Sequence, residues 1–167
     1  MGDLTERLKG VALFSGLSEE QIGRVISMGR EVRWEEGETV CVEGESGGSI
    51  YIIYAGSVKV SKRLTLRRGG DEEDLSEKVL INMDATEPVV VGEVAILTKP
   101  ERSATITVTK GCKALEIEGT ALRELCEADS ELGFTLMKNL ASMLCERLRQ
   151  VNRDVVRLAT ALTVALG

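Results

Sequence analysis

The chain has 167 residues and a mass of 18.1 kDa, which is the size of one domain. It carries 27 acidic and 21 basic residues, and the net charge of -6 argues against nucleic acid as a direct partner, because phosphate binding needs clustered positive charge. The absence of histidine excludes Ser-His-Asp and Cys-His catalysis and every metal site that needs imidazole, so neither an enzyme of these classes nor a metal is expected.

Four cysteines are scattered along the chain: Cys41, Cys112, Cys126 and Cys145. No two of them form the C-x-x-C pair of a zinc or iron–sulfur site. Scattered single cysteines are typical of reduced core residues in a cytoplasmic protein. The most apolar stretch, Leu158–Leu166, is shorter than the ~20 residues that span a bilayer. We therefore expect a cytoplasmic location and no membrane partner.

The N-terminal part of the chain, Met1 to Arg30, has a helical pattern. Leu4 and Leu8 recur at helical spacing, and Ser18 with Gln21 resembles the capping box that begins a second helix. The pattern predicts two short helices before the first strand.

The middle of the chain, from Glu31 to Ile117, alternates glycines with short runs rich in β-branched and aromatic residues. The predicted strands are Ser49–Tyr54, Ser57–Ser61, Val79–Met83, Thr105–Thr109 and Ala114–Ile117. Short strands separated by turn residues predict an antiparallel roll or barrel. Thr65 to Lys78 is polar and charged around Gly69-Gly70, and this composition predicts a long, mobile and solvated hairpin loop.

The C-terminal part, from Gly119 onward, is helical in pattern. Thr120 is a cap for a short helix that ends near Glu127, and Ser130 with Glu131 begins a long one.

Apolar residues of the long helix recur at alternating spacings of four and three: Leu144, Leu148, Val151, Val155, Leu158, Leu162 and Ala165. This heptad seam lasts about three heptads, which is near the minimum for a coiled coil. The helix either packs on its own roll or pairs with a second copy of the chain. A roll covers only one end of so long a helix, so a homodimer is favoured.

One stretch carries recognisable chemistry: Gly92-Glu93-Val94-Ala95-Ile96-Leu97, four further residues, and then Arg102-Ser103-Ala104. A glycine permits close approach of the backbone to a ligand, and the short turn after it can direct free amide N–H groups at an anion. An arginine on the following strand can hold that anion in a bidentate fork. The glutamate is suited to accept hydrogen bonds, for example from sugar hydroxyls. The pattern indicates a ligand with a negative end and a hydroxyl end.

These residues resemble the phosphate-binding cassette of the cyclic-nucleotide-binding domain family, which reads G-E-x-A-x-L, a short gap, and R-[S/A/T]-A. The matching positions are Gly92, Glu93, Ala95, Leu97, Arg102, Ser103 and Ala104. The family's entry motif and early strands are matched by Phe14–Leu17, Glu36–Glu38, Glu43–Glu45 and Tyr51–Val60. The resemblance covers the chain from about Phe14 to the end of the long helix, and it is close to the catabolite-activator branch of the family.

The resemblance implies an α+β fold. Residues 1–128 are expected to form the cyclic-nucleotide-binding antiparallel β-roll, of the double-stranded β-helix or jelly-roll type, with N-terminal helices and short cassette and hinge helices. Residues 129–167 are expected to form the long dimerisation helix. The catabolite-activator branch continues into a helix-turn-helix domain where this sequence reaches Gly167, so the chain is either a stand-alone sensor or a piece of a longer protein.

The resemblance also implies roles at the phosphate and ribose. Arg102 is expected to pair with the cyclic phosphate, helped by Ser103 and by backbone amides near Val94 and Ala95. Glu93 is expected to accept the ribose 2′-hydroxyl, and the glycine before it allows the close approach.

Other matched positions lie near the base. Val60 and Ile81 correspond to apolar positions that flank it, and Ala104 completes the cassette. On the long helix, Arg147 corresponds to a basic residue that reaches the ribose–glutamate region, and Asn152 to a polar residue that meets the purine edge.

The expected function is a regulatory module that binds a cyclic nucleotide and repositions its C-terminal helix. Ser103 stands where domains selective for cyclic GMP tend to carry threonine, which favours cyclic AMP over cyclic GMP. The alternative is a dimerisation scaffold with a degenerate pocket, in which Glu93 and Arg102 form an ion pair. A carboxylate-only enzyme is a third possibility, but no pair of carboxylates stands out by spacing.

Overall fold

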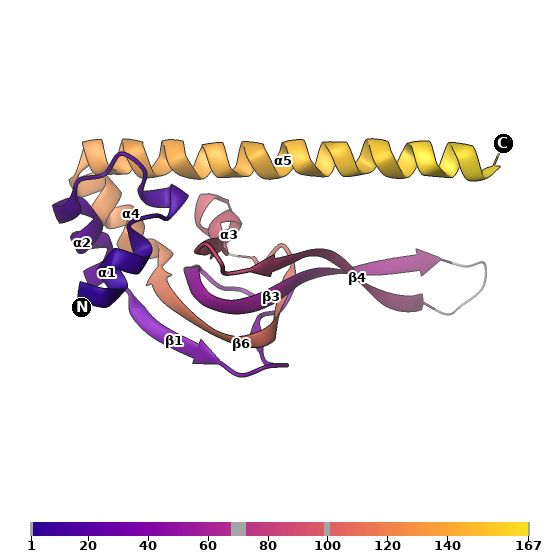
Figure 1. Ribbon diagram of the computed structural model, residues 1–167, viewed down its shortest axis with the longest axis horizontal. Coiled ribbons are helices and arrows are strands. Elements are labelled where there is room, and N and C mark those ends of the chain that lie inside the picture. The colour runs from indigo at the N-terminus through magenta and orange to yellow at the C-terminus, as the bar shows by residue number, and fades with distance from the viewer. Residues whose placement is uncertain (1, 68–72, 99–100, 167) are drawn as a thin grey trace.

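Helices occupy the two ends of the chain and strands its middle, in a computed structural model that describes residues 2–67, 73–98 and 101–166 (Figure 1). The helices are α1 (Gly2–Leu8), η1 (Ala12–Phe14), α2 (Glu19–Ser27), α3 (Glu93–Leu97), α4 (Gly119–Ala128) and α5 (Ser130–Leu166). The strands are β1 (Arg30–Trp34), β2 (Thr39–Cys41), β3 (Ser49–Arg67), β4 (Glu73–Asp84), β5 (Val89–Val91) and β6 (Thr105–Glu118).

The strands form one antiparallel sheet whose centre is made by the two long strands β3 and β6. The path runs β1-β6-β3-β4, while β2 also pairs with β6 and β5 with β3. Both long strands bend as they cross the molecule, so the sheet folds back on itself as a roll (Figure 1). The predicted fold class, an antiparallel roll with N-terminal helices and a long C-terminal helix, is confirmed.

Two glycines that suggested turns lie inside the long strands. Gly56 has φ +91° and interrupts the regular register of β3 with β6. A Cβ on Gly56 would lie 2.4 Å from the carbonyl oxygen of Gly111, so this residue serves a close approach of two backbones. The predicted strands on either side of each glycine are therefore parts of one continuous strand.

A β-ribbon made by β3 and β4 replaces most of the predicted loop over Thr65 to Lys78. The two strands pair from Ser57 with Asp84 out to Arg67 with Glu73. A β-ladder joins main-chain groups, so polar residues can extend it into solvent. The loop prediction was wrong for the paired residues, and its glycine pair lies outside the described residues.

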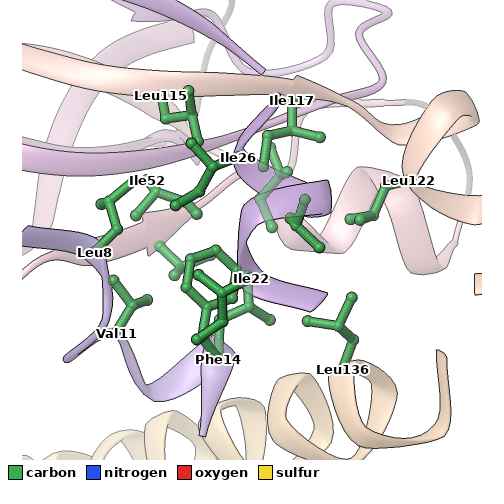
Figure 2. Close-up of a cluster of buried hydrophobic side chains, with 14 of the residues drawn as sticks. Leu8, Val11, Phe14, Ile22, Ile26, Ile52, Leu115, Ile117, Leu122 and Leu136 are labelled. Atoms are coloured by element: carbon green, nitrogen blue, oxygen red, sulfur yellow. The ribbon is translucent and has the colours of Figure 1, made fainter. Parts of the chain in front are cut away.

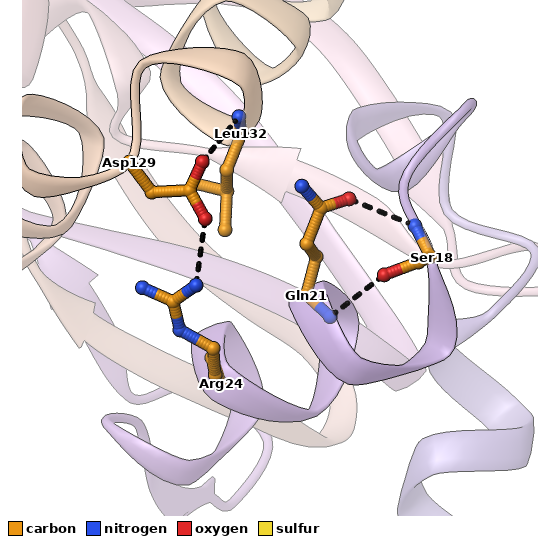
Figure 3. Close-up of polar contacts among 5 residues, drawn as sticks. All are labelled: Ser18, Gln21, Arg24, Asp129 and Leu132. Atoms are coloured by element: carbon orange, nitrogen blue, oxygen red, sulfur yellow. Dashed lines mark hydrogen bonds and ion pairs between the residues drawn. The ribbon is translucent and has the colours of Figure 1, made fainter.

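The N-terminal helices pack at one end of the roll. Ser18 caps α2 by the predicted capping box, in which its Oγ accepts the N–H of Gln21 at 3.2 Å and the Gln21 side chain accepts the N–H of Ser18 (Figure 3). Arg24 of α2 forms an ion pair with Asp129 at 2.6 Å, and the other carboxylate oxygen of Asp129 accepts the N–H of Leu132 (Figure 3).

The larger hydrophobic core joins these helices to the sheet and to the beginning of α5 (Figure 2). Phe14 lies at its centre between α2 and the sheet. Leu132, Leu136 and Leu140 of α5 are fully buried in it. Burial of a leucine stabilises a fold by ~2 kcal/mol, so these three side chains fix where α5 begins and in which direction it leaves.

Beyond Leu140, α5 runs past the roll with most of its surface exposed (Figure 1). Cys145 on this part is exposed, so the prediction of a core position was wrong for it, while Cys41 and Cys112 are buried. In the part of the chain that the structure describes, no helix has the length and apolar character needed to cross a membrane.

Candidate functional site

A cavity of about 240 Å³ opens where the roll meets α5. Strand β4, the cassette around α3, the beginning of β6 and the middle of α5 contribute to its walls. The lining residues are Cys41, Val60, Leu80, Ile81, Met83, Val91, Gly92, Glu93, Val94, Arg102, Ser103, Ala104, Ile106, Arg147, Gln150, Val151 and Asp154.

The floor of the cavity is the turn at Gly92 that begins α3. Gly92 is the N-cap residue, with φ +84°, and as a glycine it offers no capping side chain. A Cβ here would lie 2.7 Å from the carbonyl oxygen of Ser49 and 2.8 Å from Nη1 of Arg102. Only a glycine fits both the backbone conformation and the space. The first N–H groups of a helix have no intrahelical acceptor, so those of Glu93 and Val94 can serve a ligand in the cavity.

Arg102 is the central cation of the cavity, and only 6% of its surface is exposed. Its Nη1 donates a hydrogen bond of 2.8 Å to the carbonyl oxygen of Ser49. Its guanidinium lies over the ring of Tyr51, with Cζ 5.5 Å from the ring centroid. Burial raises the pKa of the Tyr51 hydroxyl, and the nearby carboxylate of Glu116 raises it further. Arg102 is thus held by a carbonyl group and an aromatic face.

The loop before β3 fixes the backbone of Arg102. The N–H of Gly44 donates to the carbonyl oxygen of Arg102, and the N–H of Arg102 donates to that of Glu45, both at 2.9 Å. A Cβ on Gly47 would lie 2.8 Å from Nε of Arg102. The guanidinium therefore lies between the backbones of Gly47 and Gly92, and a methyl group at either position would displace it.

Glu93 pairs with the long helix. Its side chain is 4% exposed, and its Oε1 accepts a hydrogen bond from Nη1 of Arg147. Nη2 of Arg147 donates to the carbonyl oxygen of Val90. One arginine of α5 thus joins the helix to both strand β5 and the carboxylate of the cassette.

The remaining walls are mainly apolar. The ribbon supplies Val60, Leu80, Ile81 and Met83. Val60 pairs with Ile81 and the next residue of β3 with Val79, so Leu80 is an extra residue in a β-bulge. The bulge breaks the alternation of the strand, which is why two consecutive side chains of β4 line one cavity.

Cys41 adds a thiol to the wall near Arg102. Burial raises the pKa of this thiol, and the charge of Arg102 opposes that rise. The neutral thiol is therefore the expected form, and it acts here as a small apolar group.

Most of the residues predicted for the site line this one cavity. They are Gly92, Glu93, Val94, Arg102, Ser103, Ala104, Val60, Ile81 and Arg147. Ala95 lies in α3, and its side chain is outside the described part of the structure. Asn152 is exposed on α5 and does not line the cavity of its own chain, in contrast to its neighbour Val151.

Sequence reasoning missed two polar residues of the lining, Gln150 and Asp154. Both lie on the helical face of Arg147, three and seven residues after it. That spacing was visible in the sequence once Arg147 was placed. The residues that hold Arg102 from behind, Gly47 and Tyr51, belong to the turn and strand before the cassette, and nothing in their local sequence indicates the contact.

The apolar seam of α5 is exposed beside the cavity. Leu148, Val151, Val155, Leu158 and Leu162 are between 55% and 70% exposed. The same spacing continues backward through Phe134, which is 70% exposed, Met137 and Ala141. The seam thus begins about one and a half heptads earlier than the sequence predicts. Met137 packs against the core of its own chain, whereas the exposed side chains from Leu148 onward have no such partner within the described part of the chain.

Comparison with known proteins gives the family of the chain. The family model described as "Cyclic nucleotide-binding domain" matches residues 31–129. The chain is 27% identical, over 155 residues, to a CRP-like cAMP-activated global transcriptional regulator of Mycobacterium tuberculosis. That alignment covers 93% of this chain and 63% of the regulator, so the chain spans less than two thirds of this relative.

Solved structures share the fold at lower identity. A cyclic nucleotide-binding domain from Methylobacillus flagellatus superposes with a TM-score of 0.75 at 19% identity, over 89% of this chain and 80% of that one. The regulatory domain of Toxoplasma gondii PKA, crystallised with cAMP, superposes with a TM-score of 0.69 at 20% identity, over 87% of this chain and 49% of that one.

Proposed function

The chain belongs to the cyclic nucleotide-binding domain family, and from this premise we propose that it is a regulatory module that binds cyclic AMP and thereby repositions α5. In this proposal Arg102, Ser103 and the first amides of α3 hold the cyclic phosphate. Glu93 accepts the ribose 2′-hydroxyl over Gly92. Val60 and Ile81 flank the base, the backbone amide near Ala95 helps those of the preceding residues at the phosphate, and Ala104 completes the cassette.

The observation that carries the proposal is that Arg102 is buried without a carboxylate partner among the described residues. A scaffold with a degenerate pocket would use Glu93 to neutralise Arg102, but Glu93 pairs with Arg147. Among the residues that the structure describes, no carboxylate forms a salt bridge with Arg102. A buried cation held by neutral groups gains strongly from a bound anion, because its own desolvation is otherwise uncompensated.

Cyclic AMP is proposed ahead of cyclic GMP on two grounds. Ser103 follows the arginine and lines the cavity, where a threonine would favour cyclic GMP. The Mycobacterium relative is described as cAMP-activated, and the Toxoplasma domain was crystallised with cAMP.

A homodimer through α5 is the second part of the proposal. The exposed seam extends over most of the helix, and such a seam is buried when two helices form a coiled coil. Asn152 follows Val151 in the sequence and lies at the edge of the apolar seam. In a coiled coil, residues at this edge meet residues of the partner helix. In the dimer, Asn152 would reach a purine edge across the interface. Differential affinity for two arrangements of the helix pair would supply the switch.

The test is isothermal titration calorimetry of the purified chain with cyclic AMP and, in parallel, cyclic GMP. We expect saturable binding of one nucleotide per chain, tighter for cyclic AMP. Arg102→Leu should weaken binding at least ~100-fold, because an unpaired phosphate in the cavity costs on the order of 2–5 kcal/mol. Arg123→Leu, which changes an exposed arginine of α4, is the matched control and should bind normally.

Failure of the test would favour the other functions. No heat and no thermal shift with either nucleotide would leave the dimerisation scaffold. Unchanged affinity of Arg102→Leu would contradict the proposed phosphate site. Measurable turnover of the nucleotide would indicate an enzyme instead of a binding module.

A further inference from the structure

The face of α5 that lines the cavity carries a polar stripe distinct from the apolar seam. Arg147, Gln150 and Asp154 are half-buried, while the residues between them are exposed. At 1.5 Å per residue, Gln150 lies about 4.5 Å and Asp154 about 10 Å further along α5 than Arg147. The stripe therefore leads away from Glu93 toward the part of the cavity walled by the ribbon.

The polar groups of the lining divide into two sets. Arg102, Ser103, Glu93 and Arg147 are committed to the phosphate and the ribose in the proposed function. Gln150 and Asp154 are the polar side chains of the cavity lining that remain. The polar edge of a buried base loses its bonds to water and must find partners in the protein. These two side chains face the space that such a base would fill.

The geometry of the pair defines what it can bind. Nε2 of Gln150 donates to both carboxylate oxygens of Asp154 at 3.0 Å, and Oε1 of Gln150 accepts from Arg153. The contact with Arg153 holds the amide with its NH₂ group toward the carboxylate. A carboxylate has about four acceptor sites and an amide NH₂ has two hydrogens. Oδ1 of Asp154 also lies 3.6 Å from Nη1 of Arg157, and the carboxylate keeps acceptor sites beyond these contacts. The pair thus presents an acceptor beside a donor.

We propose that Gln150 and Asp154 form the base-specificity pair of this cavity, with Asp154 accepting from the exocyclic amine of adenine and Gln150 donating to the adjacent ring nitrogen N1. This inference rests on the proposed function. A 6-oxo purine reverses both groups, since it places a carbonyl oxygen toward the carboxylate and an N–H toward the amide donor. Asp154 would therefore select against 6-oxo purines as well as for adenine.

The experiment compares cyclic AMP with cyclic IMP, which differs from it only at these two positions of the base. Calorimetry is performed on the full chain and on Asp154→Asn, which keeps the side-chain size and removes the charge. We expect the full chain to prefer cyclic AMP by tenfold or more. Asp154→Asn should bind cyclic AMP about tenfold more weakly and lose most of that preference.

Two further variants keep the result interpretable. Gln150→Leu should also weaken cyclic AMP, and it serves as the test if Asp154→Asn fails to fold. Arg149→Gln changes an exposed residue of the same helix that does not line the cavity, and it should keep the affinity and the preference. A variant that merely disturbed α5 would weaken both nucleotides equally and leave their ratio unchanged.

The outcomes distinguish a failure of this inference from a failure of the proposed function. If the full chain binds no cyclic nucleotide, both are wrong. If it binds cyclic AMP and the preference over cyclic IMP survives in Asp154→Asn, the function stands and the base-specificity pair is wrong. A preference for cyclic GMP that Asp154→Asn abolishes would mean that the carboxylate accepts two donors of guanine, and it would overturn the pairing with adenine.

Discussion

Single residues behind the cavity fix the position of the Arg102 guanidinium. The guanidinium is bounded by the backbones of Gly47 and Gly92, by the Ser49 carbonyl group and by the Tyr51 ring. None of these groups neutralises its charge, yet together they leave it little freedom. Because the side chain is already ordered, a bound phosphate would lose less affinity to side-chain entropy.

Gly47 gives the sharpest test of this arrangement, because its neighbour is a matched control. A Cβ at Gly47 would lie 2.8 Å from Nε of Arg102, whereas a Cβ at Gly48 would meet no atom within 4 Å. We expect Gly47→Ala to weaken cyclic AMP about tenfold in calorimetry, since the displaced guanidinium loses its fork geometry. Gly48→Ala should bind as the unmodified chain does, and equal affinities of the two variants would contradict the role of Gly47.

At the scale of elements, the junction of α4 and α5 controls the direction of the long helix. Asp129 stands between the two helices, accepts the N–H of Leu132 and forms an ion pair with Arg24 of α2. One carboxylate thus caps α5 and joins it to the N-terminal helices (Figure 3). The core contacts of Leu132 and Leu136 hold the same end of the helix from the other side.

The junction should depend on pH in a defined direction. The hydrogen bond from Leu132 and then the contact with Arg24 lower the pKa of Asp129 below its ordinary 3.8. A carboxyl group whose pKa is lower in the folded state than in the unfolded state stabilises the fold at pH values above its unfolded-state pKa. That stabilisation is lost as the pH falls through the folded-state pKa. We expect the free energy of unfolding, measured with urea, to fall less between about pH 6 and about pH 3 in Asp129→Asn than in the unmodified chain.

Glu124→Gln removes an exposed carboxylate of α4 and serves as the control for this measurement. It should keep the acid sensitivity of the unmodified chain. If Asp129→Asn and Glu124→Gln respond to acid alike, Asp129 does not stabilise the junction.

The elements show which parts of the fold a sequence can predict. The capping box at Ser18, the long helix and the cassette at Gly92 were predictable because each depends on local chemistry. Strand β1, Arg30–Trp34, was missed because its residues are largely charged and exposed, and β5 because three residues have no period. Gly56 was misleading because a glycine in a turn and a glycine at a strand bulge have the same local sequence.

The residues of the site likewise divide into those that a local motif predicts and those that only the fold brings together. The cassette residues were predicted by their motif and most of them line the cavity. Gly47 and Tyr51, by contrast, reach Arg102 only through the folding of the roll. Gln150 lies on the face of Arg147 and could have been found by helical spacing. The role of Asn152 stays a prediction, since it lies on the outer edge of the helix.

At the scale of the whole molecule, the exposed part of the α5 seam is an apolar row without a partner in the described chain. The helix that carries it continues past the roll (Figure 1), and its apolar side chains are exposed from Leu148 to Leu162. Apolar rows of this length on a monomer mark an interaction surface. The cavity borders the same row at Val151, so dimerisation and nucleotide binding share one stretch of α5.

Two pairs of substitutions test the dimer. Leu148→Asp with Leu158→Asp places charges in the seam, and Val156→Asp with Val164→Asp places them on residues of similar exposure outside it. Sedimentation equilibrium should give twice 18.1 kDa for the unmodified chain and the second pair, and 18.1 kDa for the first pair. A monomeric unmodified chain, or equal dissociation of both pairs, would refute the helix pair.

The position of Arg147 along α5 has a mechanical consequence. The helix is anchored in the core up to Leu140 and reaches Leu166, so Arg147 lies 7 residues and the tip 26 residues beyond the anchor. If the helix stays straight, a lateral movement of about 1 Å at Arg147 becomes about 4 Å at the tip, in proportion to distance along the axis. A small movement of Arg147, such as a change in its hydrogen bond to Glu93, would thereby displace the C-terminal end of α5 by about the width of a side chain.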